Sequence, residues 1–75
     1  MIKTTSITIA QIRMARGLIN ISQSKVAKEI KLSPSSYGAI EAELSDPKVS
    51  TFNKIVEYYE THGVIFKADG SVLLK

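Results

Sequence analysis

The stretch "ISQSKVAKEIKLSPSSYGAIEAE", residues 21–43, has the spacing of two short helices joined by a tight turn. Ser22 predicts the N-cap of the first helix, whose inward face is expected to be Val26, Ala27 and Ile30. Ser33-Pro34 predicts the start of the second helix, because proline disfavours a helical residue before it and suits the first helical position. Such spacing closes two helices into one rigid unit whose second helix projects outward.

Length and composition limit the fold. The chain has 75 residues and is expected to form one domain, residues 1–75. A chain of this size buries only about 60% of the surface that it exposes when unfolded. It has no cysteine and no cluster of His with carboxylates, so we expect neither disulfides nor a metal. The opening "MIKTTSITIA" lacks the long apolar run of a signal peptide or membrane helix, so we expect a cytoplasmic protein without membrane contact.

Charge is distributed unevenly along the chain. Residues 1–40 hold six cations and one anion, a balance of +5, whereas residues 41–75 hold four lysines and six acids, a balance of −2. A basic half that contains a helix pair suits a polyanionic partner, because phosphate neutralisation dominates the affinity of proteins for nucleic acid. An ordinary solubilising surface would explain the same charges.

Further helices are expected on both sides of this pair. Thr8 predicts the N-cap of a helix that ends near Asn20, because Gln11 completes a capping box and Ile7 and Ile12 occupy the positions of a hydrophobic staple. The predicted core face of that helix includes Ile12, Ala15 and Ile19. In the pair, Tyr37 and Ile40 are expected inside, and Leu32 of the turn points inward. Ser50 predicts the cap of a last helix that Gly63 ends, with an inner stripe of Phe52, Ile55, Val56 and Tyr59.

The C-terminal "VIFKADGSVLLK" predicts a β-hairpin, because two β-prone runs flank Asp69-Gly70. A two-residue type I′ turn there would place Phe66 opposite Leu73. Both faces of such a ribbon carry apolar groups, so it should pack on the helices, pair with another copy, or do both. The residues expected at a dimer interface are Ile65, Phe66, Val72 and Leu74.

From Thr8 to Val64 the chain resembles the lambda-repressor-like helix-turn-helix domain of the Xre and Cro type. The resemblance lies in the Arg-Gly-Leu of residues 16–18, the Ser-Gln of residues 22–23, the Ile-Glu of residues 40–41 and Pro47, which occur in order and at the right intervals. It implies a bundle of four or five helices that binds double-stranded DNA as a homodimer and regulates transcription. We therefore expect a mostly α protein, with a helical bundle at residues 8–63 and a β-hairpin at residues 64–75, acting as a repressor or antitoxin.

The resemblance also implies residue roles. Gln23 matches a position that touches phosphate and can brace a base-contacting side chain. Residues 34–42 match the recognition helix, in which the usual base readers correspond to Pro34, Ser35, Ser36, Gly38 and Ala39. Arg16 and Glu41 match an ion pair that is largely screened from water. Such a pair can meet in bidentate geometry, and the alternative is two unrelated surface charges.

Two departures from the family pattern matter. Lys31 stands where glycine is common, at a position that often takes a left-handed backbone, which costs on the order of 1 kcal/mol for another residue. The expected recognition helix also lacks the Arg, Lys, Gln and Asn that make bidentate base contacts. The sequence therefore predicts strong backbone and shape contributions with modest direct readout. The expected DNA contacts are Gln23, Lys25, Lys28, Lys31, Ser33, Pro34, Ser35, Ser36, Gly38, Ala39 and Lys48.

The sequence bears on two other functional classes. An enzyme is not expected, and neither is a cofactor, because the single histidine, His62, permits no Ser-His-Asp arrangement and no phosphate-binding loop is present. A protein-interaction module remains the alternative, in which the smooth second helix of the pair and the apolar hairpin contact a protein partner without specific DNA binding. The lysines before and within the turn favour DNA, since a protein interface does not require them.

Overall fold

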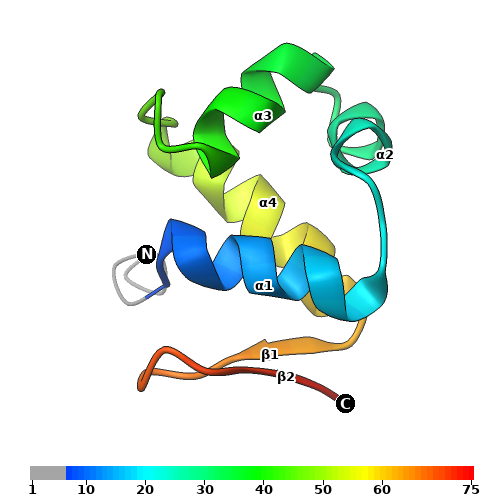
Figure 1. Ribbon diagram of the computed structural model, residues 1–75, viewed down its shortest axis with the longest axis vertical. Coiled ribbons are helices and arrows are strands. Elements are labelled where there is room, and N and C mark those ends of the chain that lie inside the picture. The colour runs from blue at the N-terminus through cyan, green and yellow to red at the C-terminus, as the bar shows by residue number, and fades with distance from the viewer. Residues whose placement is uncertain (1–6) are drawn as a thin grey trace.

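The helix pair lies within a mostly helical bundle that is followed by a C-terminal hairpin, so the expected fold class is confirmed. The computed structural model describes residues 7–75, and Lys3, counted above in the basic half, lies outside them. The elements are α1 (Ile9–Ile19), α2 (Gln23–Glu29), α3 (Pro34–Glu41), α4 (Val49–Thr61), β1 (Val64–Phe66) and β2 (Val72–Leu74). Figure 1 shows α1 and α4 between the hairpin on one side and α3 on the other. None of the helices described is long and apolar enough to cross a membrane.

Three of the four predicted helix starts are confirmed. Thr8 and Gln11 form the reciprocal capping box, with the Thr8 N–H donating to Gln11 Oε1 at 2.9 Å and the Gln11 N–H to Thr8 Oγ1 at 3.2 Å. The Ser22 hydroxyl accepts the Lys25 N–H at 3.1 Å, and the Ser33 hydroxyl accepts the Ser36 N–H at 3.2 Å. These starts depend on residues within one turn of each other, which is why the sequence reveals them.

The predicted cap of α4 is wrong. The helix begins at Val49 with Lys48 as its N-cap, and no side chain caps it. The earlier start adds the hydrogen bond from the Phe52 N–H to the Lys48 carbonyl at 2.9 Å, which a start at Ser50 would forgo. The helix thus gains a backbone bond in place of a side-chain cap. Its end is as predicted, because Gly63 follows α4 with φ of 89°, a conformation that glycine adopts readily.

The core is formed by the residues that the helical pattern placed inside. The fully or almost fully buried apolar residues are Ile12, Ala15, Val26, Ala27, Ile30, Tyr37, Ile40, Ile55, Val56, Tyr59 and Val64. Ile19, Leu32 and Phe52 are only partly buried and pack against this cluster. Each helix contributes to it, so burial of their apolar faces holds the four helices together.

Three helices end through a non-glycine residue in the left-handed conformation. Asn20, Lys31 and Glu43 have φ of 55°, 64° and 61°. After α2, the Leu32 N–H reaches back across Lys31 to the Ala27 carbonyl at 2.8 Å, the bond of a Schellman motif. The turn between α2 and α3 therefore uses the left-handed backbone expected at Lys31, without glycine.

The hairpin has a different turn from the one predicted. Its register pairs Val64 with Leu74, Ile65 with Leu73 and Phe66 with Val72. A two-residue type I′ turn needs positive φ at both central residues, but Gly70, with φ of 94°, has it and Asp69 does not. The loop is one residue longer, and Asp69 Oδ1 accepts the Ser71 N–H at 2.9 Å. The pairing predicted for Phe66 with Leu73 is therefore wrong by one residue.

This register divides the residues expected at a dimer interface between two faces. Phe66 and Val72 are half-buried and pack against the core from the inner face of the hairpin. Ile65 lies on the outer face opposite Leu73, and both are exposed. Leu74 is opposite the buried Val64 but is itself 49% exposed, because it lies at the end of the strand. The inner face therefore already has a partner within the chain.

Lys31→Gly is expected to raise the free energy of unfolding by about 0.5–1 kcal/mol, because glycine relieves the left-handed strain. Lys31→Ala is the matched control, since it removes the same charge and keeps the strain, so it should give no gain. Urea unfolding of both variants measures the difference. Equal stabilities for the two variants would show that the backbone at this turn is not strained.

Candidate nucleic-acid interface

The exposed side of α3 begins at its N-terminus. Ser33, Pro34, Ser35 and Ser36 are all exposed, and Gly38 and Ala39 are half-buried one turn further on. No charged side chain occurs between residues 32 and 40. The structure therefore brings the expected base-reading positions to one small, smooth surface at the end of the helix pair.

The serines at the start of α3 form a connected group. The Ser33 hydroxyl donates to Ser36 Oγ at 2.9 Å while it accepts the Ser36 N–H. Ser35 Oγ lies 3.4 Å from Ser33 Oγ. Because Ser36 accepts the hydroxyl proton of Ser33, its own hydroxyl remains a donor. The tip of α3 can thus offer single hydrogen bonds to a phosphate or a base edge.

The lysines around this surface differ in their partners. Lys25 Nζ lies 3.1 Å from Glu29 Oε2, and the Tyr58 hydroxyl donates to the other oxygen of Glu29 at 2.7 Å. Hydrogen bonds from Tyr58 and Lys25 lower the pKa of Glu29. Within residues 7–75, Lys28, Lys31 and Lys48 have no ion-pair partner. These three exposed cations are free to meet phosphate.

Behind α3, the Glu41 carboxylate joins three helices. Arg16 of α1 donates from Nε to Oε2 at 2.8 Å and from Nη2 to Oε1 at 3.1 Å. Gln23 of α2 donates from Nε2 to Oε1 at 3.1 Å. The Glu41 side chain is 2% exposed and that of Arg16 is 27% exposed. The expected bidentate pair is thus present, and the alternative of two unrelated surface charges is wrong.

Both members of this pair stay charged. Burial would raise the pKa of Glu41, but hydrogen bonds from Arg16, Tyr37 and Gln23 outweigh it and hold the pKa below its ordinary value. The hydrogen bond to Glu41 raises the pKa of the Arg16 guanidinium. A buried carboxylate with this set of donors fixes the angle between α3 and its two neighbours.

Tyr37 connects α3 to α4 inside the core. Its hydroxyl lies 2.6 Å from that of Tyr59, and both side chains are fully buried. Burial raises the pKa of Tyr59 to about 12 and raises that of Tyr37 further. Tyr37 is therefore a core residue, as expected, and its buried ring does not reach the exposed side of α3.

Arg13 has a role that the sequence did not indicate. It donates from Nη1 to the Glu41 backbone carbonyl and lies 3.3 Å from Glu43 Oε2. This bond satisfies a carbonyl at the end of α3, which the helix leaves without an internal partner. The available signal was the i, i+3 spacing of Arg13 and Arg16, which places both guanidinium groups toward the same neighbour.

Gly38 leaves room for Gln23. A Cβ atom built at Gly38 would lie 3.2 Å from Gln23 Oε1, so any larger residue would press on that amide. Glycine within a helix lowers the stability of that helix by about 1 kcal/mol relative to alanine. Glycine is nevertheless suited to this position because it lets α2 and α3 approach closely. Gln23 is thus held between Gly38 and Glu41, with one amide hydrogen on Glu41 and the other free for a partner outside.

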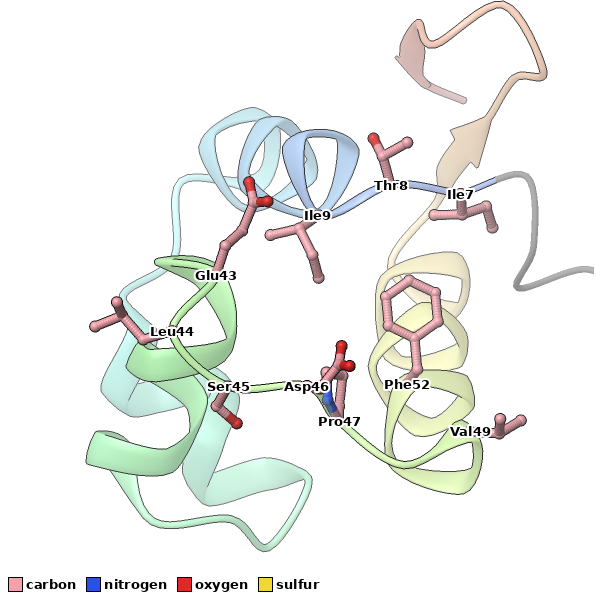
Figure 2. Close-up of a pocket in the computed structure, with 10 residues that line it drawn as sticks. All are labelled: Ile7, Thr8, Ile9, Glu43, Leu44, Ser45, Asp46, Pro47, Val49 and Phe52. Atoms are coloured by element: carbon pink, nitrogen blue, oxygen red, sulfur yellow. The ribbon is translucent and has the colours of Figure 1, made fainter.

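A wide groove of about 680 Å³ lies between the start of α1, the loop after α3 and the start of α4. Figure 2 shows Ile9 and Phe52 in this groove, and the carboxylates of Glu43 and Asp46 among its lining residues. Two acids make it a poor place for phosphate. Nowhere in residues 7–75 do three or more potential metal ligands cluster.

An outward helix after a tight turn, with a buried brace behind it, is the arrangement of a helix-turn-helix protein. A family model described as "Helix-turn-helix" matches residues 12–66, which is well over half of the chain. The chain belongs to this lambda-repressor-like, Xre-type helix-turn-helix family of DNA-binding regulators. Neither the curated proteins nor the solved structures include a significant match to it.

Glu41→Gln is expected to lower the free energy of unfolding at neutral pH by about 3 kcal/mol, because Arg16 loses its counter-charge. Folding lowers the pKa of Glu41. Its contribution is therefore complete above the ordinary carboxyl pKa and is lost as the pH falls through the lower folded value. Urea unfolding from neutral pH down to about pH 3 should show the gap between wild type and variant shrinking.

The matched control is Glu43→Gln, which removes the acid of the exposed Arg13–Glu43 pair. It should cost less than about 1 kcal/mol. A cost for Glu41→Gln no larger than that of the control, or a gap that acid leaves unchanged, would contradict the bracing role of Glu41.

Proposed function

We propose that the protein binds double-stranded DNA in a sequence-dependent manner as a homodimer and regulates transcription, as a repressor or antitoxin. The observation that carries this proposal is the exposed start of α3, flanked by unpaired lysines and fixed from behind by Glu41. The family supports the DNA-binding part. Such a role places the protein in the cytoplasm and needs neither catalysis nor a cofactor.

Phosphate contacts are assigned to the cations around α3. Lys28 and Lys31 lie at the end of α2 and in the turn that leads into α3, and Lys48 is the N-cap of α4 after the loop that follows α3. Lys25 contributes less, because Glu29 neutralises it. Gln23 and Ser33 add neutral donors at the starts of α2 and α3. These contacts fix position on the duplex and carry no sequence information by themselves.

Base readout is assigned to the tip of α3. Ser35 and Ser36 can make single hydrogen bonds to base edges, and Pro34 and Ala39 can contact thymine methyl groups. Gly38 lets the helix approach the groove closely. Because none of these residues makes a bidentate base contact, the shape and deformability of the DNA should carry much of the preference.

The second candidate function is a protein-interaction module that uses α3 and the hairpin. The uncharged surface of residues 33–39 favours it, since interface cores are depleted in charge. The three free lysines beside that surface favour DNA. Salt separates the two functions, because DNA affinity falls steeply with added salt.

Lys28→Ala, Lys31→Ala and Lys48→Ala should each weaken DNA binding at all sequences and each reduce the steepness of the salt dependence by about one unit. Lys67→Ala is the matched control, because Lys67 lies in the hairpin on the far side of α1 from α3 (Figure 1). Fluorescence anisotropy with a duplex over a range of salt concentrations measures both quantities. If all four changes altered the affinity and its salt dependence equally, the assignment of phosphate contacts to Lys28, Lys31 and Lys48 would be wrong.

Selection of bound duplexes from a random library should enrich an inverted repeat, because a two-fold dimer meets two half-sites. Repeating the selection with the double variant Ser35→Ala, Ala39→Ser should alter the preferred bases at the positions under α3 and leave the spacing unchanged. An unchanged preference would eliminate direct readout by these residues. Retention without any enrichment would favour the protein-interaction module.

A further inference from the structure

Two of the glycines lie inside helices, and their surroundings differ. Gly17 belongs to α1, and a Cβ atom added there would meet no other part of residues 7–75 within 4 Å. Gly38 belongs to α3, and a Cβ atom added there would lie 3.2 Å from Oε1 of Gln23. Glycine inside a helix is unfavourable relative to alanine. The missing side chain at Gly38 therefore serves one neighbouring group, the Gln23 amide.

The direction of the Gln23 amide is set by Glu41. Its Nε2 atom donates to Glu41 Oε1 at 3.1 Å. An ionised carboxylate only accepts hydrogen bonds, so the nitrogen of the amide must face Glu41. The oxygen is then the atom that lies against Gly38. The orientation of this amide thus follows from the charge on Glu41, which the two hydrogen bonds from Arg16 preserve.

Gln23 keeps hydrogen-bonding capacity for a partner outside the chain. Within residues 7–75, its second Nε2 hydrogen and its Oε1 oxygen have no hydrogen-bond partner. The side chain is half-buried at the first position of α2, so these groups lie at the edge of the surface. Gln11 is different, because both of its amide hydrogens are used, on the carbonyls of Lys67 and Ser71. One glutamine is therefore fully bonded inside the fold, and the other is available to a ligand.

A methyl group at position 38 would disturb the Gln23 amide. The contact of 3.2 Å is so tight that the amide oxygen would have to move by a few tenths of an ångström. Because the nitrogen is bonded to Glu41 and the backbone is fixed at the start of α2, this movement weakens the bond to Glu41 or turns the second hydrogen away. The helix α3 by itself would favour alanine. The propensity of α3 and the orientation of Gln23 therefore place opposite demands on this position.

We propose that Gly38 is a positioning residue for DNA binding, which keeps the second Nε2 hydrogen of Gln23 directed at a phosphate oxygen of the duplex. The inference rests on the proposed function and adds how the phosphate donor at the start of α2 is held in place. A phosphate oxygen suits this donor, because it accepts hydrogen bonds and carries negative charge. The side chain at position 38 then sets the affinity through α2, without a contact of its own to the DNA.

Fluorescence anisotropy with a duplex tests this coupling in the full chain. Gly38→Ala and Gln23→Ala should each lower the affinity about tenfold, because each removes a hydrogen bond to a charged group. The double variant should bind as Gln23→Ala alone does, within about twofold. The loss should be equal at every salt concentration, because a neutral donor releases no counterion. In this respect both variants should differ from the lysine variants, which change the salt dependence.

NMR spectra of the side-chain amides give a readout that a purely structural role would not change. The chain has two glutamines and two asparagines, so the Gln23 signals are identified by their absence in Gln23→Ala. Gly38→Ala should shift the Gln23 signals in the free protein. Addition of duplex should shift them in wild type and shift them less in Gly38→Ala. The Gln11 signals are the internal reference, because both of those hydrogens are bonded within the chain.

Two controls separate this effect from a general change in stability. Gly17→Ala replaces the other helical glycine in open space, so it should raise the urea concentration at which half the protein is unfolded and leave the Gln23 signals in place. In the double variant the amide that the methyl group would press on is absent. That variant should therefore be at least as stable as Gln23→Ala, and its affinity tests the proposal even if Gly38→Ala alone is poorly folded by circular dichroism.

Equal losses of affinity for Gly38→Ala with and without Gln23 would overturn the proposal, because the glycine would then act by letting α3 approach the groove. Unchanged Gln23 signals in Gly38→Ala, or an affinity equal to that of wild type, would overturn it as well. In these cases the proposed function stands if wild type binds duplexes with the lysine-dependent salt response. A wild type that binds no duplex would show that the proposed function is wrong, and the positioning role with it.

Discussion

The structure depends on one buried carboxylate. Glu41 accepts hydrogen bonds from Arg16 on α1 and Gln23 on α2, while its own helix, α3, is held to α4 through Tyr37 and Tyr59. A charge with so little exposure is costly unless every partner is in place, so these bonds form together or not at all. The surface proposed to meet DNA is consequently positioned from behind, by Glu41 and its partners within the bundle.

The parts of the fold that sequence predicts are those governed by short-range rules. Thr8, Ser22 and Ser33 cap helices because the groups they bond lie within one turn, and the core follows the helical period. The Arg16–Glu41 pair was found through the family pattern as well as by charge. The start of α4 was missed because Lys48 caps it through the backbone alone, with no side-chain signal in the sequence.

Other features could not be predicted because they depend on how helices and strands that are distant in the sequence are placed in space. The register of the hairpin follows from a three-residue loop that Asp69, Ser71 and the distant Gln11 stabilise together. The bond from Arg13 to the end of α3, and the placement of Gln23 over Gly38, need the helix positions to be known first. At the candidate site, residues 33–36 are exposed, whereas Gly38 and Ala39 are half-buried. The sequence did not indicate which lysine Glu29 neutralises.

The three left-handed helix ends give this small domain an evolutionary reserve. Asn20, Lys31 and Glu43 each hold a backbone conformation that glycine adopts with less strain. A single change to glycine at any of them is therefore expected to raise the free energy of unfolding without altering the core. The side chains at the tip of α3 do not pack in the core, since Ser35 and Ser36 are exposed. Larger side chains that lower stability can therefore evolve at the tip of α3. A glycine at one of the distant helix ends can then restore the lost stability.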